Sequence, residues 1–411
     1  MSEPNVLVIV LAGGEGKRLL PLTNDRAKPA VPFGGTYRLV DFVLSNFANA
    51  RYTRIVVLTQ YKSHSLGLHI SRTWRFSNLL GNFVTPVPAQ MRRGPFWFSG
   101  SADAIYQNLN IITDEKPDVV CVFGADHIYR MDPSQMVKFH VDSGGGVTVA
   151  AIPVARESAR DFGVIEAADD GTIIAFHEKP ADPPPMPDDP TRSLASMGNY
   201  VFDTGALIEA VTPGRLTGSP HDIGGDLMPR LAERGSARVY DFSENIVPGQ
   251  GERERGYWRD VGTLDSYYDA NMDLVAPVPV FSLYNEEWRV FTHNPPRPPA
   301  KLSRGPLGRI PEVADSLICA GSILSGSHIQ GSIIGPGVFV EEASVEGSIL
   351  FPDVEIGRGA VLRRCVIDKN VRVPPGTEVG VDHEADAARG MAISDAGVVV
   401  VEKGYEFSSD V

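Results

Sequence analysis

The stretch that decides the fold is Leu11-Ala-Gly-Gly-Glu-Gly-Lys-Arg-Leu-Leu-Pro-Leu-Thr-Asn-Asp-Arg-Ala-Lys-Pro-Ala-Val31. It follows an unbroken apolar run, residues 6–11, that is typical of a buried parallel strand. Because glycines carry no Cβ atom, the backbone can turn sharply and approach a ligand at Gly13, Gly14 and Gly16. The same stretch carries four cations: Lys17, Arg18, Arg26 and Lys28. Bare amides and clustered cations after a first strand favour a polyphosphate site over a solvated basic loop.

The glycine loop matches neither of two familiar phosphate motifs. A P-loop requires Ser or Thr after Gly-Lys, whereas Arg18 follows Lys17 here. A dinucleotide fingerprint requires a third glycine at the position that Leu19 occupies. The glycines alone are therefore weak evidence, and the residues around them carry the interpretation.

The whole stretch resembles the N-terminal signature of the sugar-nucleotide pyrophosphorylases, nucleotidyltransferases that join a nucleoside triphosphate to a sugar 1-phosphate. The match continues through Phe33-Gly-Gly35 and Arg38-Leu-Val-Asp-Phe-Val-Leu-Ser-Asn46, which resemble the glucose-1-phosphate adenylyltransferases, or ADP-glucose pyrophosphorylases. This resemblance implies AMP transfer from ATP to glucose 1-phosphate for glycogen or α-glucan synthesis, with Mg²⁺ as cofactor. It also implies catalytic roles for Arg18 and Lys28, and nucleotide contacts from the loop residues Leu11, Ala12, Gly13, Gly14 and Gly16.

Composition places the chain among ordinary globular proteins, because 43% of its 411 residues are hydrophobic and 22% are charged. Three cysteines at unrelated spacings predict neither a disulfide framework nor a zinc site. No signal peptide or membrane-length apolar stretch is recognisable, so we expect a cytoplasmic protein with no membrane partner. The net charge of −13 argues against nucleic acid as a partner. Anionic substrates remain compatible with it, because charges more than about 8 Å apart are screened in solution.

Strand-like and helix-like stretches alternate through the first two thirds of the chain. Apolar runs at 54–59, 119–123 and 147–152 suit strands, and residues 41–49 and 102–113 suit helices. This alternation predicts an α/β fold, a doubly wound and mostly parallel sheet, over residues 1–275.

A proline-rich linker, residues 276–310, precedes a different pattern. Aliphatic residues there recur at steps of six, as in Leu350, Ile356 and Leu362, although steps of five blur the phase. This hexapeptide period predicts a parallel β-helix over residues 311–411, the alternative being an antiparallel β module. The segment resembles the left-handed β-helix that ends the adenylyltransferase family, so the resemblance covers nearly the whole chain.

Two carboxylates are candidate magnesium ligands. Asp126 follows the apolar run 119–123 after Gly124 and Ala125, and ligands collect at the carboxyl ends of strands in open α/β sheets. Mg²⁺ typically binds one or two carboxylates plus substrate oxygens. The second candidate is Asp260, in Tyr257-Trp-Arg-Asp-Val-Gly-Thr263. The residues alone leave structural roles open, and the resemblance implies that both aspartates bind the metal, with Asp126 also catalytic.

The stretch Trp97-Phe-Ser-Gly-Ser-Ala-Asp-Ala-Ile105 resembles the nucleotide region of the family. The resemblance implies nucleotide contacts from Gly100, Ser101 and Ala102, and adenine-side contacts from Gln60 and Gln90. A helix cap at Ser101 after a turn at Gly100 explains those two residues equally well without a ligand.

The stretches Phe176-His-Glu-Lys-Pro180 and Ala195-Ser-Met-Gly-Asn-Tyr-Val-Phe202 resemble the hexose-phosphate pocket of the family. Lysine serves phosphate as a mobile point charge, which suits Lys179, and Glu178 suits sugar hydroxyls. An exposed Glu-Lys pair is the alternative. The other residues implied at this pocket are Phe162, Gly163, Ser196, Gly198 and Asn199.

The resemblance also implies a homotetramer regulated by phosphorylated metabolites, through Arg26, Arg38 and Arg364. Asp25 and Pro32 depart from the activator-site pattern of some relatives, which have a lysine and a histidine there. Because an acidic side chain repels a bisphosphate, the sequence argues against fructose 1,6-bisphosphate and leaves another sugar phosphate or a keto acid open.

Three other functions compete with this interpretation. One is a pyrophosphorylase for another base or sugar, such as GTP with mannose 1-phosphate. Another is a catalytically silent regulatory subunit, which the retained Arg18, Lys28 and Asp126 argue against. The third is a β-helix acyltransferase with His328 as its histidine, for which the coils are too few.

Overall fold

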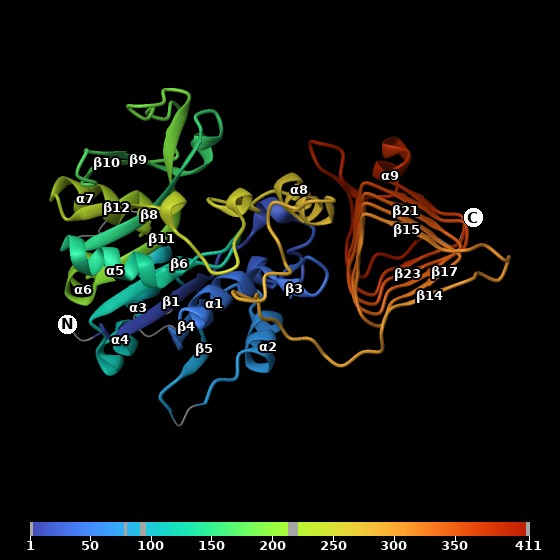
Figure 1. Ribbon diagram of the computed structural model, residues 1–411, viewed down its shortest axis with the longest axis horizontal. Coiled ribbons are helices and arrows are strands. Elements are labelled where there is room, and N and C mark those ends of the chain that lie inside the picture. The colour runs from blue at the N-terminus through green and yellow to red at the C-terminus, as the bar shows by residue number, and fades with distance from the viewer. Residues whose placement is uncertain (1–2, 78–79, 91–95, 213–220, 408–411) are drawn as a thin grey trace.

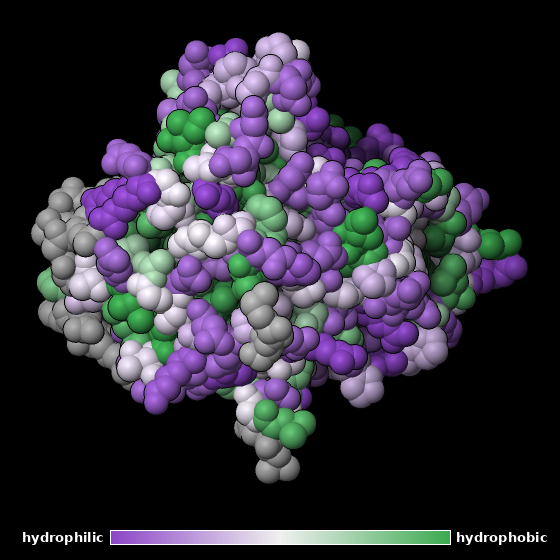
Figure 2. Space-filling view, turned by 60° about the vertical axis from the view of Figure 1, so that its left-hand side comes forward, coloured by the Kyte–Doolittle hydropathy of each residue, from purple (hydrophilic) through white to green (hydrophobic). Residues whose placement is uncertain are grey.

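The computed structural model describes residues 3–77, 80–90, 96–212 and 221–407. An α/β domain forms the N-terminal part and a triangular β-helix forms the C-terminal part, side by side (Figure 1). Among the described residues, no helix is long and apolar enough to cross a lipid bilayer. On the face seen in Figure 2, hydrophilic side chains predominate and hydrophobic ones are scattered among them.

A nine-stranded sheet forms the centre of the α/β domain, with the order β10-β9-β11-β6-β1-β4-β5 and with β8 joining β11 to β12. β1 pairs in parallel with β4 and β6, and β11 runs antiparallel to β6 and β8. The strands are β1 Val6–Ala12, β4 Arg54–Thr59, β5 Phe83–Pro88, β6 Val119–Gly124, β8 Val147–Ala155, β9 Gly163–Ala167, β10 Ile173–Glu178, β11 Arg192–Asp203 and β12 Ala237–Asp241. The predicted mostly parallel α/β sheet is confirmed.

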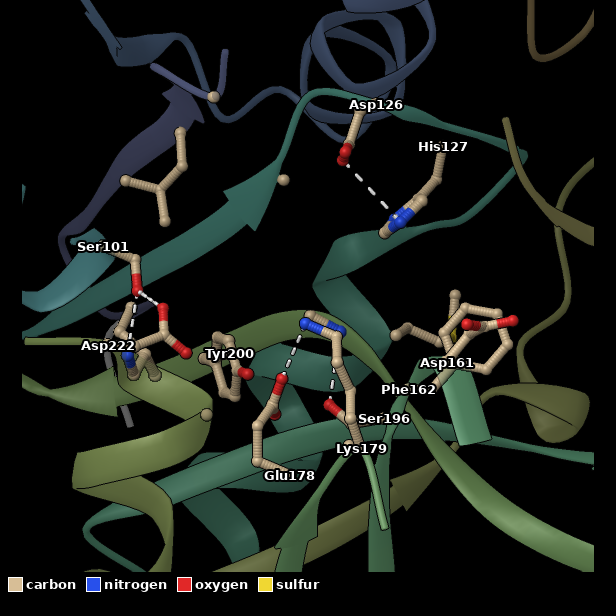
Figure 3. Close-up of a pocket in the computed structure, with 18 of the residues that line it drawn as sticks. Ser101, Asp126, His127, Asp161, Phe162, Glu178, Lys179, Ser196, Tyr200 and Asp222 are labelled. Carbon is tan, nitrogen blue, oxygen red and sulfur yellow. Dashed lines mark hydrogen bonds and ion pairs between the residues drawn. The ribbon is translucent and has the colours of Figure 1, made fainter. Parts of the chain in front are cut away.

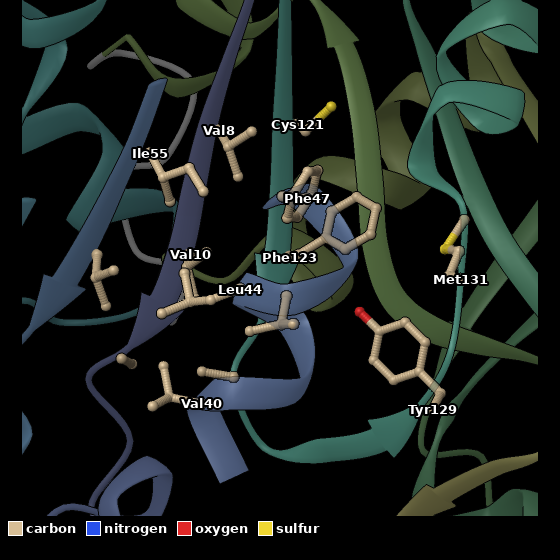
Figure 4. Packing of buried hydrophobic residues seen from close by; sticks show 14 of the residues in the cluster. Val8, Val10, Val40, Leu44, Phe47, Ile55, Cys121, Phe123, Tyr129 and Met131 are labelled. Carbon is tan, nitrogen blue, oxygen red and sulfur yellow. The ribbon is translucent and has the colours of Figure 1, made fainter. Parts of the chain in front are cut away.

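Helices cover both faces of this sheet, so its central strands are apolar throughout. Val8 and Val10 of β1 pack on one face with Leu44 and Phe47 (Figure 4), whereas alternate residues of β1 pack on the other. The first face is covered by α1 Leu39–Asn49, α2 His64–Thr73 and α5 Pro133–Ser143. The second is covered by α3 Ser101–Gln107, α4 Leu109–Glu115, α6 Thr204–Val211 and α7 Met228–Glu233.

One predicted helix is two helices in the structure. The expected helix over 102–113 is interrupted at Asn108, whose backbone φ of −114° and ψ of 19° are not helical. The Asn108 side chain donates to the carbonyl of Ala104 at 2.8 Å, which stabilises the break.

A small ribbon outside the main sheet joins distant parts of the chain. β7 (His127–Tyr129) pairs antiparallel with β13 (Trp258–Asp260), and His127 lies opposite Asp260. α8 (Leu264–Met272) then begins after Thr263, whose hydroxyl accepts from the amide of Ser266. A two-stranded hairpin, β2 (Pro32–Phe33) with β3 (Tyr37–Arg38), precedes α1.

The described residues 276–300 contain no helix or strand, and β14 (Lys301–Ser303) opens the β-helix. Three parallel sheets, β14-β17-β20-β23-β26, β15-β18-β21-β24-β27 and β16-β19-β22-β25-β29, form its sides, and β28 adds antiparallel to β29. Strand bounds are β15 Glu312–Ala314, β16 Leu317–Ile318, β17 Ile323–Ser325, β18 His328–Gln330, β19 Ile333–Ile334, β20 Phe339–Glu341, β21 Ser344–Glu346, β22 Ile349–Leu350, β23 Glu355–Ile356, β24 Val361–Arg363, β25 Cys365–Ile367, β26 Arg372–Val373, β27 Glu378–Val379, β28 Ala392–Ile393 and β29 Val399–Val401. Helix α9, His383–Ala388, lies between β27 and β28.

The predicted left-handed β-helix is thus confirmed, and the blurred period has a geometric reason. Val345 stacks on Ile329 and Leu362 stacks on Val345, which are steps of 16 and 17 residues. Three six-residue sides would give 18, so each coil has at least one shorter side. The predicted inward residues Leu350, Ile356 and Leu362 are all buried in one cluster.

The two domains share an apolar cluster. Leu274 and Phe33 of the α/β domain belong to the same cluster as Ile333, Ile349 and Val366 of the β-helix. Polar contacts flank it: the Tyr268 hydroxyl donates to the Gly347 carbonyl at 2.5 Å. The interface is therefore a continuation of the domain cores.

Candidate active site

The main cavity lies where β1 and β6 end, and its volume is about 360 Å³. Because these strands are parallel, their carboxyl ends meet at one edge of the sheet. Figure 3 shows side chains entering the cavity from several segments. The predicted site residues among its lining are Leu11, Ala12, Gly14, Lys28, Ser101, Asp126, Phe162, Gly163, Glu178, Lys179, Ser196 and Gly198.

A lysine lies between two carboxylates at one end of the cavity. The Lys28 ammonium is 2.9 Å from Asp126 Oδ2 and 3.6 Å from Asp260 Oδ1. Burial opposes the charge on Lys28, but Asp126 and Asp260 together raise the pKa of Lys28 above its usual value. Burial likewise opposes the charge on Asp126, but Lys28 and then His127 hold the pKa of Asp126 well below its usual range. Lys28 and Asp126 are therefore both charged at neutral pH.

The same carboxylates can hold a divalent cation. Asp126, His127 and Asp260 each offer a ligand atom, and these atoms lie within 4.8 Å of one another. The pairing of β7 with β13 brings them together. Two carboxylates facing the same space, already compensated by a lysine, are a donor set that suits a hard cation shared with phosphate oxygens.

The glycine loop is anchored beneath this centre. Gly16 has a φ of +68°, and a Cβ atom there would lie 3.1 Å from both Lys28 Cβ and Thr23 Cγ2. The Thr23 hydroxyl donates to the Gly16 carbonyl at 2.9 Å. Glycine at position 16 therefore permits both the turn and the close packing against Lys28.

Arg18 lies in a neighbouring cavity of about 400 Å³ that also contains Asp161, Phe162 and Asp260. A Cβ atom at Gly262 would lie 2.8 Å from Asp260 Oδ2 and 3.0 Å from Arg18 Nη2. The bare Cα of Gly262 thus leaves room for both groups. Arg18 and Asp260 therefore lie close enough for Arg18 to contact an anion bound beside Asp260.

At the predicted nucleotide end, Gln60 holds the segment that precedes α3. Its amide accepts from the Phe98 backbone N–H at 2.6 Å and donates to the Phe98 carbonyl at 3.2 Å. Next to it, Tyr61 and Trp97 stack with ring centroids 5.9 Å apart and planes at 10°. Gln60 and this aromatic pair therefore fix the approach to Gly100 and Ser101.

Six predicted nucleotide residues lie outside the lining of the main cavity: Gly13, Gly16, Gln60, Gln90, Gly100 and Ala102. Gly13 packs beside Gln60, with the Gln60 Cβ 3.4 Å from its Cβ position. Gly100 directly precedes α3. Gln90 lies in a separate cavity, with Val87 and Asn108. Ala102, also absent from the main lining, is fully buried and its N–H donates to His221 O at 2.9 Å.

At the predicted sugar-phosphate end, Glu178 and Lys179 pair at 3.0 Å. Lys179 has a φ of +46°, which turns it from the end of β10 into the cavity. Ser196 and Gly198 lie opposite, at a bulge in the pairing of β11 with β8. Asn199 does not line the cavity, because it points into the core and is fully buried.

The sequence analysis missed several lining residues. His127, Tyr200, Asp222 and Gly224 all line the main cavity. Asp126 and His127 are adjacent in sequence, so the strand-end argument could have included His127. Asp222 follows the undescribed residues 213–220, and no local pattern points to it.

The predicted effector residues lie between the two domains. Arg26 is only 4% exposed, and its Nη2 donates to Asp368 Oδ1 at 2.8 Å. Arg38 Nη1 donates to the Ser65 carbonyl at 2.9 Å, and the Arg364 guanidinium lies over the Tyr268 ring. Burial, together with Arg38 and Arg26, lowers the pKa of Lys369 to about 7. Arg38 and Arg26 therefore make the surroundings of Lys369 electropositive.

Asp25 pairs with Lys403 of the β-helix. The side-chain hydrogen bond from Lys403 lowers the pKa of Asp25, although burial slightly opposes it. The repulsion expected between Asp25 and a phosphorylated activator is thus partly compensated. The histidine of the acyltransferase alternative, His328, lies apart from the main cavity, 3.3 Å from Glu312 on the β-helix surface.

Comparisons with known proteins cover nearly the whole chain. The family described as nucleotidyl transferase matches residues 7–276, and the GlmU-like C-terminal hexapeptide family matches residues 298–401. A glucose-1-phosphate adenylyltransferase of Parafrankia sp. is 60% identical over 408 residues, covering 98% of this chain and 99% of the relative. Proteins of the same name from Mycobacterium marinum and Corynebacterium jeikeium are 59% and 56% identical; they cover 98% of this chain, with 99% and 98% of their own lengths matched.

Proposed function

Because the chain belongs to the glucose-1-phosphate adenylyltransferases, within the nucleotidyl transferase family, we propose that it transfers AMP from ATP to α-D-glucose 1-phosphate. The products are ADP-glucose and pyrophosphate, for glycogen or α-glucan biosynthesis. One observation carries the assignment of the active site. Lys28 lies between Asp126 and Asp260, at the strand ends that face Glu178 and Lys179.

The reaction needs no protein nucleophile. A phosphate oxygen of glucose 1-phosphate forms a bond to the α-phosphorus of ATP, and the bond from that phosphorus to the β-phosphate oxygen breaks. Asp126 and Asp260 would hold Mg²⁺, which when bound supplies positive charge to the phosphate oxygens. Lys28 and Arg18 would neutralise the charge on the departing pyrophosphate from two sides.

Binding at the two ends positions the reacting groups. Amides of the glycine loop and of Gly100 and Ser101 would hold the nucleotide, with Gln60 toward the base. Lys179 would bind the sugar phosphate. The Glu178 carboxylate would accept hydrogen bonds from sugar hydroxyls, and the Ser196 hydroxyl would donate or accept one. Holding both anions in line supplies much of the rate enhancement.

Pyrophosphate release from ATP and glucose 1-phosphate, with and without Mg²⁺, tests this function. We expect release that requires both substrates and the metal. Parallel assays with UTP, GTP and dTTP, and with mannose 1-phosphate, distinguish other pyrophosphorylases. Binding of both substrates without turnover would indicate a regulatory subunit and overturn the proposal.

We also propose that phosphorylated metabolites regulate the enzyme at the region around Arg38, Arg364 and Lys369. The positive charges of Arg38 and Arg26, which help to lower the pKa of Lys369, support an anion site there. Arg26 contributes its charge, since its guanidinium is already bonded to Asp368. Rates measured across a panel of sugar phosphates and keto acids test this proposal, and a panel without effect contradicts it. The predicted homotetramer is tested by light scattering on the purified chain.

A further inference from the structure

One hydrogen-bonded pair joins the two ends of the main cavity. The Ser101 hydroxyl donates to Asp222 Oδ1 at 2.5 Å and accepts from the Ile223 N–H at 2.8 Å (Figure 3). Ser101 is the first residue of α3 and lies within the segment assigned to the nucleotide. Asp222 directly precedes the π-helix Ile223–Leu227, on the sugar side.

The π-helix touches a sugar-phosphate residue. Asp222 Oδ2 accepts from the Gly225 N–H at 3.2 Å, and the Asp222 N–H donates to Asp226 Oδ2 at 2.7 Å. Within the turn that these bonds fix, Gly224 packs against Glu178. A Cβ atom at Gly224 would lie only 2.7 Å from Glu178 Oε2. Asp222 is therefore connected through this turn to Glu178.

Backbone hydrogen bonds also connect α3 to the residue before Asp222. The N–H groups of Ala102 and Asp103 both donate to the His221 carbonyl, at 2.9 Å and 3.3 Å. The free amides of the first turn of α3 are thus satisfied by the residue before Asp222. α3 and the π-helix begin from one shared hydrogen-bonded junction.

We propose that the Ser101–Asp222 pair couples nucleotide binding to sugar-phosphate binding. The inference rests on the proposed function, because it takes the two ends of the cavity as the two substrate sites. Ordering of the segment before α3 by the nucleotide fixes Ser101, and Ser101 fixes the turn that supports Glu178. By linkage, glucose 1-phosphate must strengthen nucleotide binding by the same factor. Ser101 and Asp222 are positioning residues in this scheme.

Calorimetric titration of the full chain with glucose 1-phosphate measures the coupling. The titration is made in Mg²⁺ alone and in Mg²⁺ with α,β-methylene ATP, which cannot release pyrophosphate. For the unaltered chain we expect about tenfold tighter binding with the analogue, within the range of ordinary coupling. Ser101→Ala removes the hydroxyl and keeps the backbone N–H, and in this variant the difference is expected to fall below about twofold.

Conservative and matched variants separate positioning from folding. Ser101→Thr keeps the hydroxyl and is expected to keep the coupling. Asp222→Asn replaces one carboxylate oxygen by an NH2 group, so Asp222 can no longer accept from both Ser101 and Gly225, and the coupling is expected to be lost. This variant carries the test if Ser101→Ala does not fold. Ser243→Ala removes a similar hydroxyl, which donates to Asp241 at 2.7 Å elsewhere, and is expected to behave as the unaltered chain.

The outcomes separate this inference from the function beneath it. Coupling that persists in both Ser101→Ala and Asp222→Asn overturns it. Loss of analogue binding alone in Ser101→Ala, with glucose 1-phosphate binding still coupled in Asp222→Asn, also overturns it and assigns Ser101 a direct nucleotide contact. An unaltered chain that binds both ligands without coupling overturns it while leaving the proposed function intact. An unaltered chain that binds neither ligand overturns both.

Discussion

His127 and Asp260 lie opposite each other across the β7–β13 ribbon, although they belong to widely separated parts of the chain. This pairing sets the spacing between the Asp126 and Asp260 carboxylates, because Asp126 directly precedes β7. Lys28 then lies between the two carboxylates. The candidate metal site is therefore built by strand pairing rather than by one local motif.

Replacing Asp126 tests the metal assignment. We expect Asp126→Asn to lower kcat by at least about 10²-fold, because Asp260 would be the one carboxylate left to bind both Lys28 and the cation. The melting temperature is expected to change little, since the side chain is part-exposed at the cavity. Pyrophosphate release and calorimetry measure the two effects. Asp241→Asn, outside the cavity lining, is the control, and a near-normal rate in Asp126→Asn would refute the assignment.

Replacing Lys179 tests the sugar-phosphate end. We expect Lys179→Gln to raise the KM for glucose 1-phosphate by about tenfold or more and the KM for ATP by less than twofold. The loss of one phosphate-binding charge at one end explains the asymmetry. Steady-state kinetics with each substrate varied in turn measure it. Lys138→Gln, an exposed lysine paired with Asp142, is the matched control, and equal changes in both KM values would contradict the assignment.

The buried Arg26–Asp368 pair is expected to contribute to domain docking. Both side chains are at most 5% exposed, so Asp368→Asn leaves the Arg26 charge buried with a weaker partner. We expect the free energy of unfolding to fall by about 3 kcal/mol. The exposed Arg156–Asp182 pair gives the comparison, since Asp182→Asn is expected to cost less than about 1 kcal/mol. Urea unfolding measures both, and equal losses would argue against a structural role for the buried pair.

Lys369 is expected to make stability depend on pH. Its pKa is about 7 in the folded chain and near 10.5 when unfolded, so the unfolded chain binds its proton first as pH falls. The resulting destabilisation grows from about pH 10.5 downward and is complete below about pH 7. Lys369→Met removes it, so this variant gains stability relative to the unaltered chain between pH 8.5 and 6.5. Urea unfolding at both pH values tests this prediction. A stability difference between Lys369→Met and the unaltered chain that does not change with pH would contradict it.

Much of this architecture could be predicted because its signals are local. The apolar run of β1 and the steps of six at Leu350, Ile356 and Leu362 reflect burial on fixed faces, which the residues themselves encode. The break at Asn108 could not be predicted, because a side chain that bonds its own backbone competes with a helix only in context. Coils of 16 and 17 residues likewise follow from corner geometry that a period of six hides.

The residues of the candidate site likewise include some that the sequence predicts and some that it does not. Asp126, Lys28 and Lys179 lie in stretches whose residues point to anion or metal chemistry, and all three line one cavity. Asp222 was missed because its importance comes from a contact with Ser101, and such a contact has no local pattern. Gln90 illustrates the converse, since its position in the sequence suggested the base but its side chain lies in another cavity.

The two domains share the apolar cluster that contains Phe33, Leu274, Ile349 and Val366, so neither domain can be removed without exposing part of it. Cutting the chain within residues 276–300 would uncover the hydrophobic sides of both fragments and expose them to water. The connecting segment also keeps the halves at high effective concentration, which the fragments would lose. The β-helix therefore helps to stabilise the α/β domain, and a chain without the β-helix would need a more polar surface there.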